Sequence, residues 1–179
     1  MGDPSFIAPS ATLVGEVYLG ARNTIWHNVV IRGDLNAVVL DREINIGENS
    51  VLYTASNLPN GLPARLSIGK HCYIQPGCTL YSCELGKDVF VGYNTVIMEG
   101  SRIGDGVILD PNSVVPPGRI IPPMQHWGGN PIQYIRDVED RDKHTTRMAA
   151  EGSVSKADAY TQNFMPFNNA YLLKENNLP

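Results

Sequence analysis

The sequence lacks several features that would define a protein class at once. No stretch approaches the about 18 consecutive apolar residues that would indicate a membrane-spanning helix, so no transmembrane segment is predicted. The net charge is −4 and the 14 basic residues are scattered, which argues against nucleic acid as a partner. There are only three cysteines, Cys72, Cys78 and Cys83, an odd number without the spacing of a disulfide framework. Their small number favours a reducing compartment over secretion.

What the sequence does contain is an aliphatic position that recurs every six residues. The anchors are Ile7, Leu13, Leu19, Ile25, Ile31, then Ile68, Ile74, Leu80, then Leu85, Val91, Ile97, Ile103, Leu109, Val115 and Ile121. Neither the helical period near 3.6 nor the strand period of 2 produces this spacing, which also disfavours an ordinary sandwich of alternating strands. Hexapeptide repeats are typical of a parallel β-helix, in which three units form one triangular coil around inward-pointing anchors. The sequence therefore predicts an all-β solenoid.

The repeat also sets the domain boundaries. Residues 1–128 are predicted to form the β-helix, interrupted by a loop at residues 52–67 that contains Pro59, Gly61 and Pro63. Long loops without their own structure are commonly functional, so this loop is the first place to search for chemistry. The solenoid is expected to end at two pairs of prolines, because proline cannot donate a ladder hydrogen bond.

A C-terminal helix and a tail are predicted after the solenoid. Asn130 is a favoured N-cap and Pro131 a favoured first helical residue, so a helix is expected over residues 129–152, with Gly152 as its stop. Its apolar stripe would pack along a face of the solenoid or of a neighbouring one. Residues 153–179 are predicted to be a docking tail, since they contain two aromatic–apolar clusters but too little apolar sequence for a core of their own.

Several segments together resemble the γ-class carbonic anhydrases, and most of all the eukaryotic branch that forms a domain of mitochondrial respiratory complex I. The matching segments are Ile25-Trp-His-Asn-Val-Val-Ile-Arg-Gly-Asp34, Ile46-Gly-Glu-Asn-Ser50, Ile68-Gly-Lys70, Gly92 and Trp127-Gly-Gly-Asn-Pro131. The resemblance runs from about residue 5 to residue 145. It implies a left-handed β-helix that assembles into trimers, with a zinc ion at each subunit interface held by three histidines from two chains.

None of the three zinc-ligand positions that the resemblance assigns is a histidine here. They fall on Pro59, Pro76 and Tyr81. A catalytic zinc site needs three protein ligands and an open position for the water whose pKa the metal lowers, and proline offers no donor atom. A tyrosine, with an ordinary pKa near ~10, is a poor substitute for neutral imidazole. We therefore predict no metal cofactor and no catalytic residue, although the family has both.

Other histidines could in principle replace the missing ligands. They are His27, His71, His126 and His144, which belong to different parts of the predicted fold. A cluster of His71, Cys72 and Cys78 is conceivable, but adjacent residues of a strand point to opposite sides. Cys72 and Cys78 are better explained as small buried residues.

Arg32 and Asp34 are retained, and in the family these residues form ion pairs and hydrogen bonds at the subunit contact. The alternative is a solvated surface pair that contributes little. The resemblance thus predicts a non-catalytic structural subunit, part of a trimer of related chains, attached to the membrane arm of complex I on the matrix side of the mitochondrial inner membrane.

Three other functions are compatible with parts of the sequence. The chain could belong to a heterotrimeric zinc carbonic anhydrase whose working site lies between the partner chains. It could be a hexapeptide acyltransferase, although neither His27 nor His71 lies in a supporting motif. It could also resemble the capping subunits of dynactin, which share the β-helix and an Arg-Gly-Asp-like element. The Trp127–Pro131 segment and the sequence after it favour the complex I branch.

Overall fold

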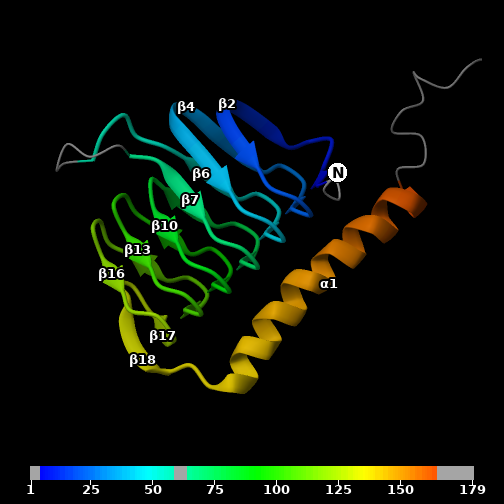
Figure 1. Cartoon of the computed structure of the whole chain (residues 1–179). Coiled ribbons are helices and arrows are strands. Elements are labelled where there is room, and N and C mark those ends of the chain that lie inside the picture. The colour runs from blue at the N-terminus through cyan, green and yellow to red at the C-terminus, as the bar shows by residue number, and fades with distance from the viewer. Residues whose placement is uncertain (1–4, 59–63, 165–179) are drawn as a thin grey trace, which may run out of the picture.

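The predicted solenoid is confirmed by the computed structural model, which describes residues 5–58 and 64–164 (Figure 1). The chain winds as a left-handed parallel β-helix whose three faces are built from short strands one coil apart. Consecutive coils pair in parallel register. Glu84, Arg102 and Ile120, for example, lie side by side in three successive coils.

The first face, which we name the helix face, is one continuous sheet. Its strands in spatial order are β1 (Phe6–Ile7), β3 (Thr24–Ile25), β5 (Asn45–Ile46), β8 (Tyr73–Ile74), β11 (Phe90–Val91), β14 (Ile108–Leu109), β17 (Gln125–Gly128) and β18 (Gln133–Asp137). All pairs are parallel except the last, in which β18 runs antiparallel to β17.

The other two faces share the long strands β2 (Thr12–Leu19) and β4 (Val30–Leu40), which run from one face onto the next. The tyrosine face continues from residues 30–32 of β4 through β6 (Val51–Tyr53), β9 (Thr79–Tyr81), β12 (Val96–Ile97) and β15 (Val114–Val115). The glycine face continues from residues 38–40 of β4 through β7 (Leu66–Ile68), β10 (Glu84–Leu85), β13 (Arg102–Ile103) and β16 (Ile120–Ile121).

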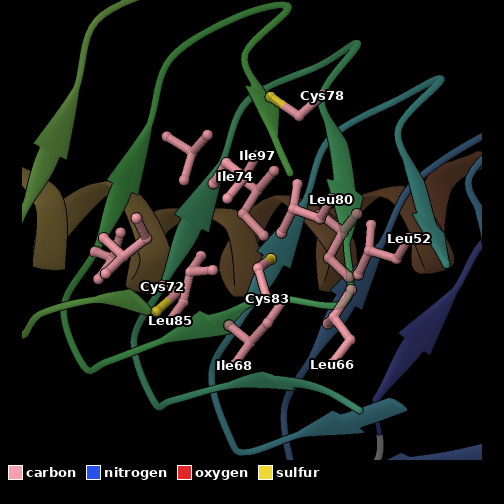
Figure 2. Packing of buried hydrophobic residues seen from close by; sticks show 14 of the residues in the cluster. Leu52, Leu66, Ile68, Cys72, Ile74, Cys78, Leu80, Cys83, Leu85 and Ile97 are labelled. Carbon is pink, nitrogen blue, oxygen red and sulfur yellow. The ribbon is translucent and has the colours of Figure 1, made fainter. Parts of the chain in front are cut away.

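The aliphatic anchors fill the interior as the repeat predicts. Ile31, Ile74, Leu80 and Ile97 are completely buried, and each lies beside its equivalent in a neighbouring coil. Figure 2 shows Ile74, Leu80 and Ile97 directed into the core. The small residues four positions after the anchors, such as Cys78, are buried beside them. The core is thus one continuous column of stacked aliphatic side chains.

In most of the described coils, the residue three positions before the inward aliphatic residue of a strand lies at a corner with a positive φ. At one corner these residues are Arg22, Glu43, His71, Asp88, Gly106 and Met124, and at the next they are Asn28, Asn49, Gly77, Asn94 and Asn112. Asparagine and glycine tolerate this left-handed conformation better than other residues do, which accounts for the second corner. At the first corner, Glu43 contacts both Arg22 and His71, and His71 also contacts Asp88.

The C-terminal end of the solenoid is closed in two ways. Met98 and Gly104 donate their backbone N–H groups to the last coil, at Val115 and Ile121. The residues one coil further on are Pro116 and Pro122, which have no N–H to donate, as the sequence predicts. On the helix face, β18 folds back along β17 and covers that end of the sheet.

The predicted helix at residues 129–152 is wrong in both boundaries. The Asn130–Pro131 peptide is cis, Ile132 is buried against the core, and the chain forms β18 before the single described helix, α1 (Asp140–Phe164). Pairing with β17 and burial of Ile132 therefore outweigh the local preference for a helix start. Residues 153–164 of the predicted tail are the last turns of α1, and residues 165–179 lie outside the described residues.

Helix α1 begins and packs for identifiable reasons. Glu139 donates its N–H to the Asp142 carboxylate at 3.0 Å, and Arg136 lies 2.7 Å from the same carboxylate. These bonds form an N-terminal cap, and the one from Arg136 contributes most to lowering the pKa of Asp142 to about 2. Gly152 does not end the helix, because the residues that follow pack on the helix face. No helix in the described residues is long and apolar enough to cross a membrane. Helix α1 lies along the helix face, in contact with β1, β3, β5 and β8.

Candidate functional site

The site that the sequence singles out lies on the tyrosine face, where side chains of successive coils stand in rows. Arg32, Tyr53 and Tyr81 occupy equivalent positions in neighbouring strands β4, β6 and β9. The structure thus brings together Arg32, which the resemblance predicts at a subunit contact, and Tyr81, which it predicts at a zinc-ligand position, from segments far apart in the sequence.

Tyr53 and Tyr81 are stacked face to face. Their ring centroids are 4.4 Å apart and the ring planes differ by 15°. Burial raises the pKa of Tyr53, and the neighbouring Tyr81 and Glu99 raise it further. A neutral phenol is a weak ligand for a metal cation, so this stack is poorly suited to bind a metal at Tyr81, where the resemblance predicts a ligand position.

Pro76, the second position that the resemblance assigns to a zinc ligand, lies at a corner between the helix face and the tyrosine face. Its carbonyl oxygen accepts a hydrogen bond from the Asn94 N–H at 3.1 Å, and its ring packs against the backbone of Gly47. The residue therefore has a structural role in stacking the coils. Pro59, the third position, lies outside the described residues.

The loop that starts after β6 is held at its base by Ser82 and Asn36. The Ala55 N–H donates to Ser82 Oγ at 2.7 Å, and Ser82 Oγ donates to the carbonyl of Ala64 at 2.7 Å. Asn36 adds two bonds from its side-chain amide to the carbonyls of Ala55 and Ser56, both at 2.7 Å. Both ends of the loop are thereby fixed to the solenoid. Its sequence, LYTASNLPNGLPARLS, supplies no histidine, cysteine or carboxylate.

Arg32 and Asp34 form an ion pair within one chain. Arg32 Nη2 lies 2.5 Å from Asp34 Oδ2, and this hydrogen bond lowers the pKa of the Asp34 carboxyl group. The arginine side chain is 54% exposed, so a neighbouring subunit could still contact it. The expected contact between subunits stays a prediction.

Two histidines are engaged at the surface of the solenoid, in different places. His71 Nε2 lies 2.6 Å from Glu43 and its Nδ1 3.2 Å from Asp88, within the charged corner. His27 is hydrogen-bonded to Ser10 at 2.8 Å and to the Tyr160 hydroxyl of α1 at 2.9 Å. Neither histidine is directed toward the tyrosine pair.

His126 and His144 belong to the C-terminal part of the chain. His126 Nε2 lies 2.6 Å from Asp110 at the end of the helix face, and His144 is exposed on α1. Across residues 5–58 and 64–164, no group of three potential metal ligands is found.

The three cysteines are directed into the core. Burial raises the pKa values of Cys72 and Cys83 to about 12 and that of Cys78 to about 11. Thiols held so far from ionisation are poor nucleophiles and poor metal ligands, because both roles need the thiolate. The conceivable His71, Cys72 and Cys78 cluster is not formed, since His71 is bound by carboxylates at the corner.

Sequence reasoning missed the carboxylates around His71 and the docking of Tyr160 on His27. A signal for the first was partly present, because His71 and Asp88 each stand three residues before an anchor and so share one corner. Glu43 stands three residues before Ile46, which falls between the two runs of anchors read from the sequence. The partner of His27 could not be found this way, since α1 lies outside the repeat.

The stacked coils and the retained Arg–Gly–Asp segment define a hexapeptide-repeat β-helix protein of the γ-carbonic-anhydrase-like kind. The family model described as dynactin subunit 5 matches residues 8–170, and the chain belongs to that family.

Two curated proteins and one solved structure illustrate these relationships. The chain is 29% identical over 171 residues to gamma carbonic anhydrase 1, mitochondrial, of Arabidopsis thaliana, covering 92% of this chain and 60% of that protein. It is 31% identical over 144 residues to the carnitine operon protein CaiE of a Proteus species, covering 80% and 70%. A hexapeptide transferase family protein from Anaplasma phagocytophilum has the same fold, with a TM-score of 0.75, 24% identity and coverage of 87% and 92%. The chain spans about three fifths of the length of the mitochondrial relatives.

Proposed function

We propose that this chain is a non-catalytic, γ-carbonic-anhydrase-like structural subunit. It assembles with related chains into a trimer that attaches to the membrane arm of respiratory complex I, on the matrix side of the mitochondrial inner membrane. The resemblance of its segments to that branch and the two mitochondrial relatives from Arabidopsis thaliana support this assignment.

The observation that carries the proposal is the stacked pair of Tyr53 and Tyr81. In the family, the position of Tyr81 holds a zinc-binding histidine. Here the two rings pack on each other, and Pro76 replaces a second ligand with a residue that has no donor atom. Zinc-dependent hydration of carbon dioxide requires three ligands and a bound water, and this chain supplies none of the three histidines.

The tyrosine face also suits contact with another subunit. Outside the stacked rings, its outward side chains are largely aliphatic and only partly covered, among them Val51, Val96 and Val114. A flat, rigid and mostly apolar sheet face is typical of permanent subunit interfaces. Arg32 stands at one end of this surface, where it can donate to a carboxylate of a neighbour as well as to Asp34.

The zinc test uses the purified protein and its assembly. We expect elemental analysis to find no zinc in the purified protein that could be bound at the positions of Pro59, Pro76 and Tyr81. A triple variant with Pro59→His, Pro76→His and Tyr81→His is the smallest change that restores a ligand set, whereas each single change leaves it incomplete. About one zinc per copy of the unmodified chain, or strong carbon dioxide hydration by that chain alone, would contradict the proposal.

The assembly test uses Arg32→Ala and Asp34→Ala, with Arg65→Ala as the matched control. Arg65 is similarly exposed, at 62%, but lies on the glycine face. The first two changes should weaken trimer formation in sedimentation at low concentration, and the double variant should lose less than the sum because the two residues act as a unit. The control should sediment like the unmodified protein. If the Arg32 and Asp34 variants also dissociate no faster, the Arg–Gly–Asp segment is only a surface feature.

Native gel electrophoresis of the endogenous protein, with identification of the comigrating chains, distinguishes the proposed function from two others. The match to the dynactin subunit 5 model favours a capping subunit of a dynactin-type complex, which would migrate without complex I subunits. A heterotrimeric zinc carbonic anhydrase would comigrate with histidine-bearing partners and hydrate carbon dioxide. Comigration with complex I subunits supports the proposal made here.

A further inference from the structure

The glycine face carries an open groove of about 470 Å³, a volume typical of ligand sites. The groove crosses β7, β10, β13 and β16, which follow one another along the solenoid (Figure 1). Helix α1 packs on the helix face, and the subunit contact proposed above uses the tyrosine face. The groove therefore lies on a different face of the solenoid from both.

The floor of the groove is backbone, because side chains are missing there. Gly86 and Gly104 follow the inward residues of β10 and β13. A Cβ on Gly86 would lie 2.8 Å from the backbone nitrogen of Asp105, and one on Gly104 would lie 2.5 Å from that of Pro123. The coils are stacked too closely for a side chain at these positions, so the strip beside the outward side chains stays bare.

One wall of the groove is a row of outward side chains with unequal charges. Glu84, Arg102 and Ile120 occupy equivalent positions in three successive coils. The Glu84 carboxylate lies 3.3 Å from Arg102 Nε and 3.8 Å from Arg65 Nη2. One carboxylate thus faces two guanidinium groups, and both arginine side chains remain about three fifths exposed, at 61% and 62%.

The opposite rim of the groove adds further positive charge. Lys70 and Lys87 stand at this rim, and neither forms an ion pair within residues 5–58 and 64–164. Asp105 is the acidic residue of the rim, and its carboxylate accepts the Lys87 backbone N–H at 2.8 Å. Four basic and two acidic side chains therefore surround the groove, although the whole chain has a net charge of −4. This local excess of positive charge favours an acidic occupant.

We propose that the groove binds a short extended segment of a partner protein, which carries acidic residues and an apolar one. The carboxylates pair with the exposed guanidinium groups of Arg65 and Arg102, since arginine offers a fork of donors that fits a carboxylate. The apolar side chain covers Ile120, which is 67% exposed, beside Pro122.

The dimensions of the groove suit such a segment. Four neighbouring strands about 4.8 Å apart span about 14 Å, a distance that about four extended residues cover. An extended chain can lie on the bare strip between the two rims, whereas a flat lipid surface would rest on the rims. The geometry thus favours a peptide segment over a membrane.

The inference is independent of the proposed function, because the glycine face contains neither the tyrosine pair nor Arg32. Charge variants of the groove should sediment like the unmodified protein. Loss of peptide binding and loss of the trimer are therefore separate outcomes.

The first test measures how the full chain binds a fluorescein-labelled peptide, a leucine followed by a run of glutamates, by fluorescence polarisation. Arg102→Glu should weaken binding about tenfold or more, because it removes a charge-assisted hydrogen bond and adds repulsion. Arg65→Glu should act in the same direction. Arg141→Glu is the matched control, since Arg141 is 76% exposed and paired with a glutamate but lies on α1. Equal affinities of the Arg102 and Arg141 variants, or no binding by the unmodified chain, overturn the proposal.

A second test varies the occupant. Replacing the glutamates of the peptide by lysines should abolish binding. Ile120→Ser should weaken binding of the leucine peptide, while a peptide with serine in place of leucine binds alike to both proteins. If both peptides respond equally to Ile120→Ser, the proposal is overturned. It is also overturned if phosphatidylserine vesicles bind through Arg102 and the glutamate peptide does not compete with them, because the occupant is then a lipid headgroup.

Discussion

Among single residues, Gly104 on the glycine face lies against the backbone of the next coil with no room for a side chain. A Cβ added to Gly104 would lie 2.5 Å from the backbone nitrogen of Pro123 in the next coil. A Cβ added to Gly152, on α1, meets nothing within 4 Å. The two positions make a matched pair for the same substitution.

We expect Gly104→Ala to lower the free energy of unfolding by about 2–3 kcal/mol, because the coils must move apart to admit the methyl group. Gly152→Ala should raise it by about 0.5–1 kcal/mol, since alanine is the better helix former. Urea denaturation of both variants measures the two signs. If the two variants changed the free energy of unfolding equally, the coils would be able to move apart at Gly104 with little cost.

The buried thiols predict how stability depends on alkaline pH. Folding raises the pKa values of Cys72 and Cys83 to about 12, so between pH 9 and 12 the unfolded chain releases protons that the folded chain keeps. Stability should therefore fall as pH rises through this window, by up to ~1.4 kcal/mol per pH unit for each thiol. Below pH 8 these groups contribute no pH dependence.

The measurement is the free energy of unfolding from pH 8 to pH 11. The Cys83→Ala variant should show a shallower decline than the unmodified chain, even if it is less stable at every pH. A slope that does not change would mean that the thiol titrates alike in both states.

Helix α1 is attached to the solenoid mainly through small side chains. It lies on the helix face through small buried residues at Thr146, Ala150, Ser153 and Ala157, and the Ser153 hydroxyl is 3.1 Å from Thr24 Oγ1. With little apolar area in this row, the aromatic group around Tyr160 supplies much of the attachment. Its ring lies against Phe6 and Trp26.

Tyr160→Ala should loosen the last turns of α1 and cost about 2 kcal/mol, because the ring contacts and the bond to His27 are lost together. Tyr160→Phe is the control. It keeps the ring and should lose only about 1 kcal/mol with the hydroxyl bond. Amide exchange over residues 153–164 and the fluorescence of Trp26 would report the loosening. Similar behaviour of the two variants would assign the attachment to the hydroxyl alone.

The elements also show where sequence reasoning succeeds. The solenoid was predictable because every coil repeats the same requirements, an inward aliphatic anchor and a small residue four positions later. The segment after Trp127 does not repeat, so only local signals were available there. Asn130 and Pro131 have the composition of a helix start, but Ile132 is buried in the core and the strand β18 forms instead.

The candidate site was predictable only in part for the same reason. The repeat places Arg32, Tyr53 and Tyr81 in one row, so their proximity follows from counting residues. The ring stacking of the tyrosines and the pairing of Arg32 with Asp34 in one chain depend on side-chain conformations that no period determines. The docking of α1 on His27 also needed the structure.

For the whole molecule, the proposed trimer predicts that stability depends on protein concentration. Dissociation accompanies unfolding of an obligate oligomer, so the apparent Tm should rise by a few degrees for a tenfold increase in concentration. Differential scanning calorimetry at several concentrations measures this rise, with Arg32→Ala expected to reduce Tm most when dilute. A Tm independent of concentration would point to a monomer.

Because three hexapeptide units make one coil, the stacked part of this protein can be shortened without turning its faces only by whole coils. Removing three consecutive units deletes one coil and returns everything after it to its original face, whereas removing a single unit turns all that follows by a third of a revolution. In the second case α1 would be carried from its own face onto a different one. Removing a full coil also shortens the solenoid by about 4.8 Å, which is close to the pitch of one helical turn. A shorter relative that keeps the same helix contacts should therefore lack three units of the repeat and close to one turn of the helix.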